Sequence, residues 1–210
     1  MEDMKILYDH QVFSAQIYGG ISKYFCEIMK PYCHSGRVKF DISIVYSNNH
    51  YLENSEICKC KPFLKSVKFK GKNRIMNFLN EAHSKGFLKS QDFDIFHPTY
   101  YNPYFLKHNG KKPYVLTIYD MIHEQYPQFI LRNDRTSEFK RILVQRASRI
   151  IAISQNTKKD ILHFIDVDEN KVDVVYLGNS PAIKDNFSPM VIKLPERFIL
   201  FVGNRQRHKN

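Results

Sequence analysis

The sequence lacks any apolar stretch long enough to cross a bilayer. Its longest uninterrupted apolar run, Phe198–Val202, holds five residues, whereas a transmembrane helix needs about 20. The first residues, Met1 to Asp9, include acidic side chains and lack the apolar core and the small-residue cleavage site of a secretory signal. We therefore expect a cytoplasmic protein.

Motifs that would identify several common chemistries are also missing. Neither GxGxxG nor GxxxxGK(S/T) occurs, so a standard dinucleotide or nucleoside triphosphate site is not supported. No Ser/His/Asp or Cys/His order is recognisable, and no two carboxylates stand at a fixed spacing, so hydrolysis is not supported. The four cysteines form no CxxC pair and no spacing typical of zinc, so we expect reduced thiols, no metal and no cofactor; they are Cys26, Cys33, Cys58 and Cys60.

The composition is that of a folded domain with an excess of positive charge. The 210 residues are 43% hydrophobic and 14% aromatic, which is too apolar for a disordered chain and sufficient for a core without disulfides. The formal net charge of +11 suggests an anionic partner, which can be nucleic acid, anionic lipid or a phosphorylated small molecule.

Most of this charge lies between Lys61 and Ser90, where eight cations face a single anion, so the window carries +7 of the +11. Within it, an apolar stripe at i, i+3, i+4 and i+7 predicts an amphipathic helix; the stripe is Ile75, Phe78, Leu79 and Ala82. Three interpretations stay open: the stripe packs on the sheet, the segment contacts an anionic membrane, or it binds nucleic acid. The Phe spacing disfavours nucleic acid. The membrane contacts would be Lys65, Lys68, Lys70, Lys72 and Arg74.

Strands that alternate with helices predict an α/β fold with a parallel sheet covered on both faces. The expected strands are Lys5–Asp9, Val38–Tyr46, Asp94–His97, Tyr114–Tyr119, Arg149–Ser154 and Val172–Tyr176. A long loop is expected between the first strand and Gly19. The expected helices are Ile21–Cys33, Thr136–Ala147 and one that begins at Ser154 as its N-cap.

The composition changes after Leu177. The next residues contain Gly178, Pro181, Pro189 and Pro195, which is typical of a linker. A further strand is expected at Phe198–Val202, without the helix that should follow it. We therefore expect a domain at residues 1–177, a linker at 178–197 and the truncated start of a second domain at 198–210.

Candidate site residues follow the expected strands, because ligands of open parallel sheets bind beyond the carboxyl ends of the strands. They are Asp9, His10, His97, Tyr119, Asp120 and Ser154. Asp120 is the strongest candidate, since a carboxylate there can accept hydrogen bonds from sugar hydroxyls or take up a proton; a turn or capping role is the alternative. His97 and His123 are candidate orienting donors, with a structural role as the alternative. Gly19 and Gly20 would let backbone N–H groups approach an anion at a helix start.

Five segments in this order resemble the N-terminal half of a group 1 (family 4) retaining glycosyltransferase of the GT-B fold. They are Tyr18–Tyr24, Asp94–Tyr101, Leu116–Ile122, Arg146–Ser154 and Val174–Gly178. Phe201 to Gly203, together with Lys209, resembles the opening of that family's C-terminal domain. The resemblance implies two Rossmann-like domains that face each other across a cleft, with a parallel sheet and helices on both faces in each.

The resemblance also implies a function and a site. The whole enzyme would move a sugar from a nucleotide-sugar donor to a glycan or lipid-linked acceptor in cell-surface polysaccharide synthesis, at the inner face of the cytoplasmic membrane and without a metal. Asp120 would be catalytic, and the acceptor-side cleft would contain His10, His97, Tyr119, His123 and Ser154. The donor diphosphate would lie near Gly19, Gly20, Arg205 and Lys209.

Two departures from the family pattern limit these expectations. Tyr119 stands where the family often has His, so a role that needs an imidazole there is not supported. The donor domain is absent after Asn210, so we expect the 210-residue chain to have little or no activity alone. The alternative from a different class is a nonenzymatic module that binds a sugar, a nucleotide or nucleic acid.

Overall fold

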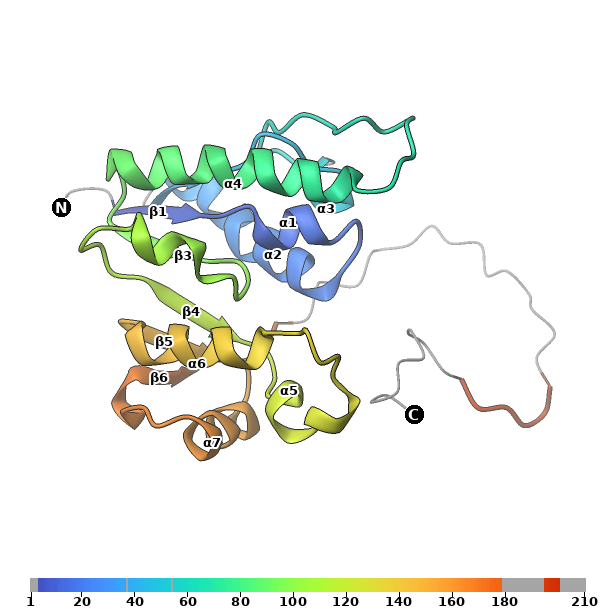
Figure 1. Ribbon diagram of the computed structural model, residues 1–210, viewed down its shortest axis with the longest axis vertical. Coiled ribbons are helices and arrows are strands. Elements are labelled where there is room, and N and C mark those ends of the chain that lie inside the picture. The colour runs from blue at the N-terminus through green and yellow to red at the C-terminus, as the bar shows by residue number, and fades with distance from the viewer. Residues whose placement is uncertain (1–3, 37, 54, 179–194, 201–210) are drawn as a thin grey trace.

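The computed structural model describes residues 4–36, 38–53, 55–178 and 195–200 (Figure 1). Among them, six parallel strands form the central layer: β1 (Met4–Tyr8), β2 (Val38–Ile42), β3 (Ile95–His97), β4 (Val115–Ile118), β5 (Arg149–Ala152) and β6 (Val172–Val174). They pair in the orders β2-β1-β3 and β4-β5-β6. A parallel bridge between Phe96 and Tyr114 joins the two halves. The predicted α/β fold with a parallel sheet is therefore confirmed.

Helices cover this sheet on both faces (Figure 1). They are α1 (Gln11–Ala15), α2 (Gly20–Ser35), α3 (His50–Glu53), α4 (Lys72–Ser90), α5 (Ile122–Gln125), α6 (Thr136–Arg146) and α7 (Gln155–Phe164). Three short 3-10 helices, Pro103–Lys107, Pro127–Phe129 and Glu169–Lys171, lie in the connections. No helix in the described part of the chain has the length and apolar character that a membrane span requires.

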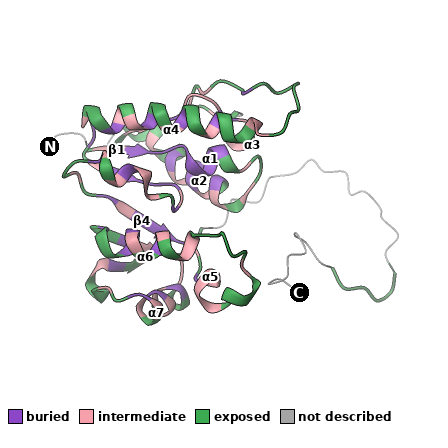
Figure 2. Cartoon of the chain, viewed as in Figure 1, coloured by how far each residue is buried: buried purple, intermediate pink, exposed green. Residues whose placement is uncertain are grey.

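The core consists of two clusters, one for each half of the sheet. The first gathers around Phe96, Leu116 and Ile150, and the second around Tyr8 and Phe25; each of these side chains is at most 2% exposed. Buried residues accordingly line the strands and the inner faces of the helices (Figure 2). β4 is buried over most of its length, and its sequence Val-Leu-Thr-Ile accordingly lacks the alternation of apolar and polar residues that is typical of a strand with one solvent face.

Three local expectations are wrong. The expected loop before Gly19 contains α1, whose Ser14 N–H donates to the His10 carbonyl at 2.8 Å. β2 ends at Ile42, short of Tyr46, because the Ile44 N–H turns back to the Ile42 carbonyl at 2.8 Å. Residues 198–200 are not in a strand, since no strand of the described residues pairs with them; the rest of that expected strand lies outside the described residues.

The predicted amphipathic helix is present as α4, but its apolar stripe faces outward. Ile75 is 48% exposed and Phe78 is 71% exposed. The buried face is instead formed by Met76, Asn80, Ser84 and Leu88. Asn80 accepts the Tyr46 N–H at 2.9 Å and Ser84 shares a 2.7 Å hydrogen bond with Ser43, so these polar side chains are satisfied in the interior. The interpretation that the stripe packs on the sheet is therefore wrong.

Candidate functional site

The carboxyl ends of the strands meet at one edge of the sheet, and β1 is where the order of the strands reverses. The chain leaves β1 for β2 on one side and later returns to place β3 on the other. Such a reversal opens a crevice between the loops that follow the two strands, which is the usual ligand position in this class of sheet. The connection to α1, the start of α2 and the segment that leads into α5 lie at this edge (Figure 1).

The loops after β1 and β3 are tied together by the buried carboxylate of Asp9, whose exposed fraction is 0%. It accepts hydrogen bonds from the Thr99 N–H at 2.8 Å, the Thr99 hydroxyl at 2.6 Å and the Gln11 amide at 2.7 Å. The Tyr104 hydroxyl adds a longer contact of 3.3 Å. A carboxylate that is saturated in this way positions the rim of the crevice and is not free to bind a ligand.

The glycine pair lies at the start of α2. Gly19 is the N-cap with extended backbone, and a Cβ there would collide with the side chain of Gln16. At Gly20 a Cβ would meet no atom within 4 Å, so the protein itself does not require glycine at that position. The backbone of this 16-residue helix is thus open at Gly20, but the Ser22 N–H in the same turn donates to Gln16 Oε1 at 3.2 Å and is not free.

Two of the expected site histidines are interior residues held in the neutral form. Burial lowers the pKa of His97 to about 4, and its Nε2 lies 3.0 Å from the Thr117 hydroxyl, which links β3 to β4. Burial also lowers the pKa of His10, whose Nδ1 lies 3.1 Å from the Ser14 hydroxyl. The Nε2 of His10 is buried and has no partner among the described residues.

Ser154 caps α7, as predicted. Its hydroxyl accepts a hydrogen bond from the Thr157 N–H at 3.0 Å, which satisfies one of the N–H groups that a helix leaves unpaired at its start. The side chain is thereby engaged in a local hydrogen bond at the same edge of the sheet.

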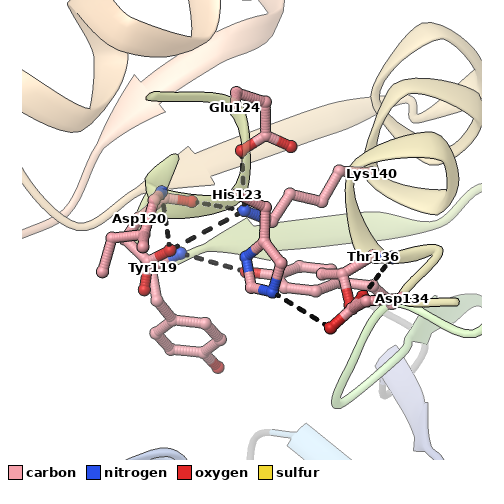
Figure 3. Close-up of polar contacts among 9 residues, drawn as sticks. Tyr119, Asp120, His123, Glu124, Asp134, Thr136 and Lys140 are labelled. Carbon is pink, nitrogen blue, oxygen red and sulfur yellow. Dashed lines mark hydrogen bonds and ion pairs between the residues drawn. The ribbon is translucent and has the colours of Figure 1, made fainter. Parts of the chain in front are cut away.

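Asp120 follows β4 and opens the short helix α5 (Figure 3). Its side chain is 48% exposed, and its Oδ1 accepts the Ile122 N–H at 3.2 Å. Asp120 therefore does have the turn role that was the alternative to a catalytic one. Its second carboxylate oxygen, however, has no partner in the described structure. Asp120 thus remains available to a ligand at the crevice.

Tyr119, which precedes Asp120, is anchored and neutral. Its ring packs edge-on against Tyr24, with the ring centroids 5.8 Å apart, and its N–H donates to the Tyr101 hydroxyl at 3.2 Å. Burial raises its pKa well above the usual value for a tyrosine. Its hydroxyl can therefore donate a hydrogen bond, but it does not act as a base.

The residue that holds this segment in place is Lys140 of α6, which the sequence analysis missed. Its exposed fraction is 0%, and its ammonium group donates to the Asp120 carbonyl at 2.8 Å and to Glu124 Oε2 at 3.1 Å (Figure 3). It also lies 5.4 Å from the centre of the Tyr101 ring and 3.7 Å from Asp120 Oδ1. Its sequence signal is limited to helical spacing from Leu143 and Val144, with which it shares the buried face of α6, and that spacing does not reveal its distant partners.

Three buried polar atoms of residues 119–124 have no partner among the described residues: the Tyr119 hydroxyl, His123 Nδ1 and Glu124 Oε1. The other nitrogen of His123, Nε2, lies 3.6 Å from Asp134 Oδ2. Of the groups in this segment, the half-exposed Asp120 carboxylate is the one open to solvent, and its free oxygen can accept a hydrogen bond from a ligand hydroxyl group. Among the described residues, no group of three His, Cys, Asp or Glu side chains is arranged to hold a metal ion. Arg205 and Lys209 lie outside the described residues.

Comparison with known proteins gives a family and a fold. Residues 37–181 match the model of Glycosyltransferase Family 4. The chain is similar to Anabaena Alr3699/HepE, solved in complex with UDP and glucose, with a TM-score of 0.55 and 16% identity over 84% of this chain and 45% of that one. A second similar structure is the apo form of the lipopolysaccharide outer core galactosyltransferase WaaB, with a TM-score of 0.47 and 15% identity over 82% and 45%. No curated protein sequence matches. The chain thus spans about 45% of the length of these structures.

Proposed function

Because the chain belongs to glycosyltransferase family 4, we propose that it is the acceptor-side half of a retaining glycosyltransferase with the GT-B fold. The whole enzyme would move a sugar from a nucleotide-sugar donor to a glycan or lipid-linked acceptor in polysaccharide synthesis. The observation that carries the proposal is the half-exposed carboxylate of Asp120 at the carboxyl edge of the sheet, one oxygen of which has no partner among the described residues. The UDP and glucose in the HepE structure support a nucleotide-sugar donor.

The chemistry requires two kinds of stabilisation, and this half offers a part of each. A leaving diphosphate needs donors that are already oriented, which the open backbone at Gly20 and the start of α2 can supply. The acceptor hydroxyl needs a hydrogen-bond acceptor that orients it and withdraws its proton, for which we propose Asp120. His123 and Tyr119 would hold other hydroxyl groups of the sugars. By the family resemblance, Arg205 and Lys209 would contact the diphosphate. The step as proposed uses no metal.

The second half of the enzyme would hold the nucleotide sugar opposite this edge. Closure of the two halves would exclude water, so that the sugar is transferred to the acceptor and is not hydrolysed. It follows that the 210-residue chain alone should release no nucleoside diphosphate from nucleotide sugars.

The proposal is tested with the intact protein from its source cells and with the 210-residue chain. Nucleoside diphosphate release is measured with a panel of nucleotide sugars and extracted cell glycans or glycolipids. Asp120→Asn should lower kcat about 100-fold or more, the effect of losing a general base, whereas Asp166→Asn, an exposed carboxylate after α7, should leave it unchanged. Turnover by the 210-residue chain alone, or an Asp120→Asn protein with full activity, would contradict the proposal. Sugar binding without turnover by the intact protein would favour the nonenzymatic module.

A further inference from the structure

One face of the domain combines exposed apolar side chains with exposed cations. It comprises the loop before α4 and the first two turns of that helix, and we call it the basic apolar surface. Its apolar members are Leu64, Val67, Phe69, Ile75, Phe78 and Leu79, and its cations are the exposed Lys65, Lys68, Lys70 and Arg74 and the half-buried Lys72.

All six apolar side chains are unusually open to solvent. Their exposed fractions run from 38% for Leu79 to 71% for Phe78. Ile75, Phe78 and Leu79 stand at i, i+3 and i+4 of α4, so they form one continuous stripe on the outer side of the helix. Single exposed apolar residues are normal, but a contiguous set marks an interaction surface.

The charges around this stripe are largely uncompensated. Lys68, Lys70 and Arg74 are exposed, and none of them makes an ion pair within the described ranges. Lys65 pairs with Glu53, and Lys72 donates to the Leu64 carbonyl at 2.7 Å, which fixes the loop against the helix. The fixed loop therefore presents free cations beside apolar side chains.

Two adjoining hollows shape the surface. One, of about 340 Å³, lies among Val67, Lys68, Phe69 and Arg74, and the other, of about 470 Å³, lies between α1 and the Phe78 side of α4. The second hollow is lined by Ser14 and Ala15 at the end of α1, and the Ser14 hydroxyl lies 3.1 Å from Nδ1 of His10, which follows Asp9 at the rim of the crevice. The start of α4 and its preceding loop lie at the same end of the molecule as α1 and α5 (Figure 1).

We propose that the basic apolar surface docks this domain on an anionic lipid bilayer. Ile75, Phe78 and Leu79 would enter the boundary between headgroups and acyl chains, while Lys68, Lys70 and Arg74 contact anionic headgroups, as in helices that lie in the membrane interface. Each cation near such a surface strengthens binding about fivefold. Docking in this orientation places the crevice edge next to the bilayer. The inference goes beyond the proposed transfer reaction and does not depend on it.

The charges and the side chains favour a bilayer over other occupants. A second copy of the chain would bring like cations face to face, which opposes pairing through this surface. Nucleic acid would engage the cations, but it would leave the aliphatic groups of Ile75 and Leu79 without a partner, since single strands stack on aromatic rings. Only an amphipathic, anionic partner satisfies both features.

The charge requirement is tested by sedimentation of the 210-residue chain with vesicles of phosphatidylcholine, alone or with 30% phosphatidylglycerol. We expect binding only to the anionic vesicles, weakened at least 100-fold in the triple variant Lys68→Glu, Lys70→Glu, Arg74→Glu. The matched control reverses three exposed cations elsewhere, Lys107→Glu, Lys111→Glu and Lys159→Glu. Equal losses in the two triple variants, or no binding to anionic vesicles by the unaltered chain, would overturn the proposal.

The apolar requirement has its own readout, because the chain has no tryptophan. Phe78→Trp provides a single reporter whose emission should shift to the blue on anionic vesicles, while Met4→Trp, at a side chain 47% exposed at the opposite, amino end of β1, should not shift. Phe78→Ser should weaken binding about tenfold while Met4→Ser does not. Bilayer docking would be refuted by any of three results. The first is the absence of an emission shift at Phe78→Trp, the second is salt-dependent retention on oligonucleotides in place of vesicles, and the third is a dimer that Phe78→Ser disrupts.

Discussion

Replacement of Lys140 by Met should destabilise the domain far more than the loss of any surface ion pair. The side chains of Lys140 and Glu124 are 1% and 5% exposed, and their charged atoms are 3.1 Å apart. Glu124 Oε1 has no partner, so Lys140 is the group that compensates the buried carboxylate. Methionine fills a similar volume but leaves that carboxylate and the Asp120 carbonyl unpaired.

The magnitude follows from this burial. Removal of one member of a buried pair costs about 3–5 kcal/mol, because the remaining charge is uncompensated in a medium of low polarity. Glu124→Gln alone should cost less, since Lys140 keeps its 2.8 Å hydrogen bond to the Asp120 carbonyl and its contact with Asp120 Oδ1. The double variant, which buries no charge, should recover about 2 kcal/mol relative to the sum of the single variants.

The assay is urea unfolding of the four chains that make up this double-mutant cycle. At a slope of about 2 kcal/mol per molar urea, Lys140→Met should lower the unfolding midpoint by roughly 2 M. The matched control is Lys158→Met, since Lys158 pairs at 3.3 Å with a Glu169 side chain that is 69% exposed, and it should cost less than about 1 kcal/mol. Equal costs for Lys140→Met and Lys158→Met, or additive costs in the cycle, would show that the buried pair does not hold the Asp120 segment.

Two further predictions concern the rim of the crevice. The pKa of His97 falls from 6.5 to about 4 on burial. The neutral imidazole therefore contributes fully to the free energy of unfolding above pH 6.5, and this contribution, roughly 3 kcal/mol in all, is lost as the pH falls toward 4. His97→Gln, which carries no charge, should show a flatter pH dependence in urea unfolding at pH 7.5, 6 and 5, and parallel profiles of the two proteins would contradict this assignment. Asp9→Asn places an amide group against the donors of Thr99 and Gln11 and should cost about 2–3 kcal/mol by thermal unfolding, whereas Asp92→Asn, at a side chain that is 75% exposed, should cost less than about 1 kcal/mol.

The sequence was sufficient to predict the strands and the capped helix start, because their signals are local. Six apolar or β-branched segments correspond to the six strands of the described structure, and Ser154 caps α7 through a bond to a residue three positions away. Strand ends were less accurate. The alternation of apolar and polar residues continues to Tyr46, but β2 stops at Ile42. The reason is that a strand ends where its partner ends, and Ile42 pairs with Tyr8, the last residue of β1.

The face of α4 could not be predicted from its own sequence. The partners of its buried polar residues are distant, since Asn80 bonds to the backbone of Val45 and Tyr46 and Ser84 bonds to Ser43. A count of apolar residues at helical spacing therefore identified the stripe but could not tell whether it faces the sheet or the solvent. Lys140 was missed for the same reason, because its partners Asp120 and Glu124 belong to a different segment.

Phe78 and Lys140 depart from local rules in opposite ways, since an apolar side chain is exposed and a charged one is buried. Local rules place Phe78 inside and Lys140 outside, and the structure reverses both, with Phe78 71% exposed and Lys140 0% exposed. Natural sequences violate local rules mainly where function requires it. Lys140 supports the segment of Asp120, and Phe78 borders a hollow that adjoins α1 at the crevice rim. The residues at which sequence reasoning fails are thus those that place the candidate carboxylate, and those that would orient its crevice toward a bilayer.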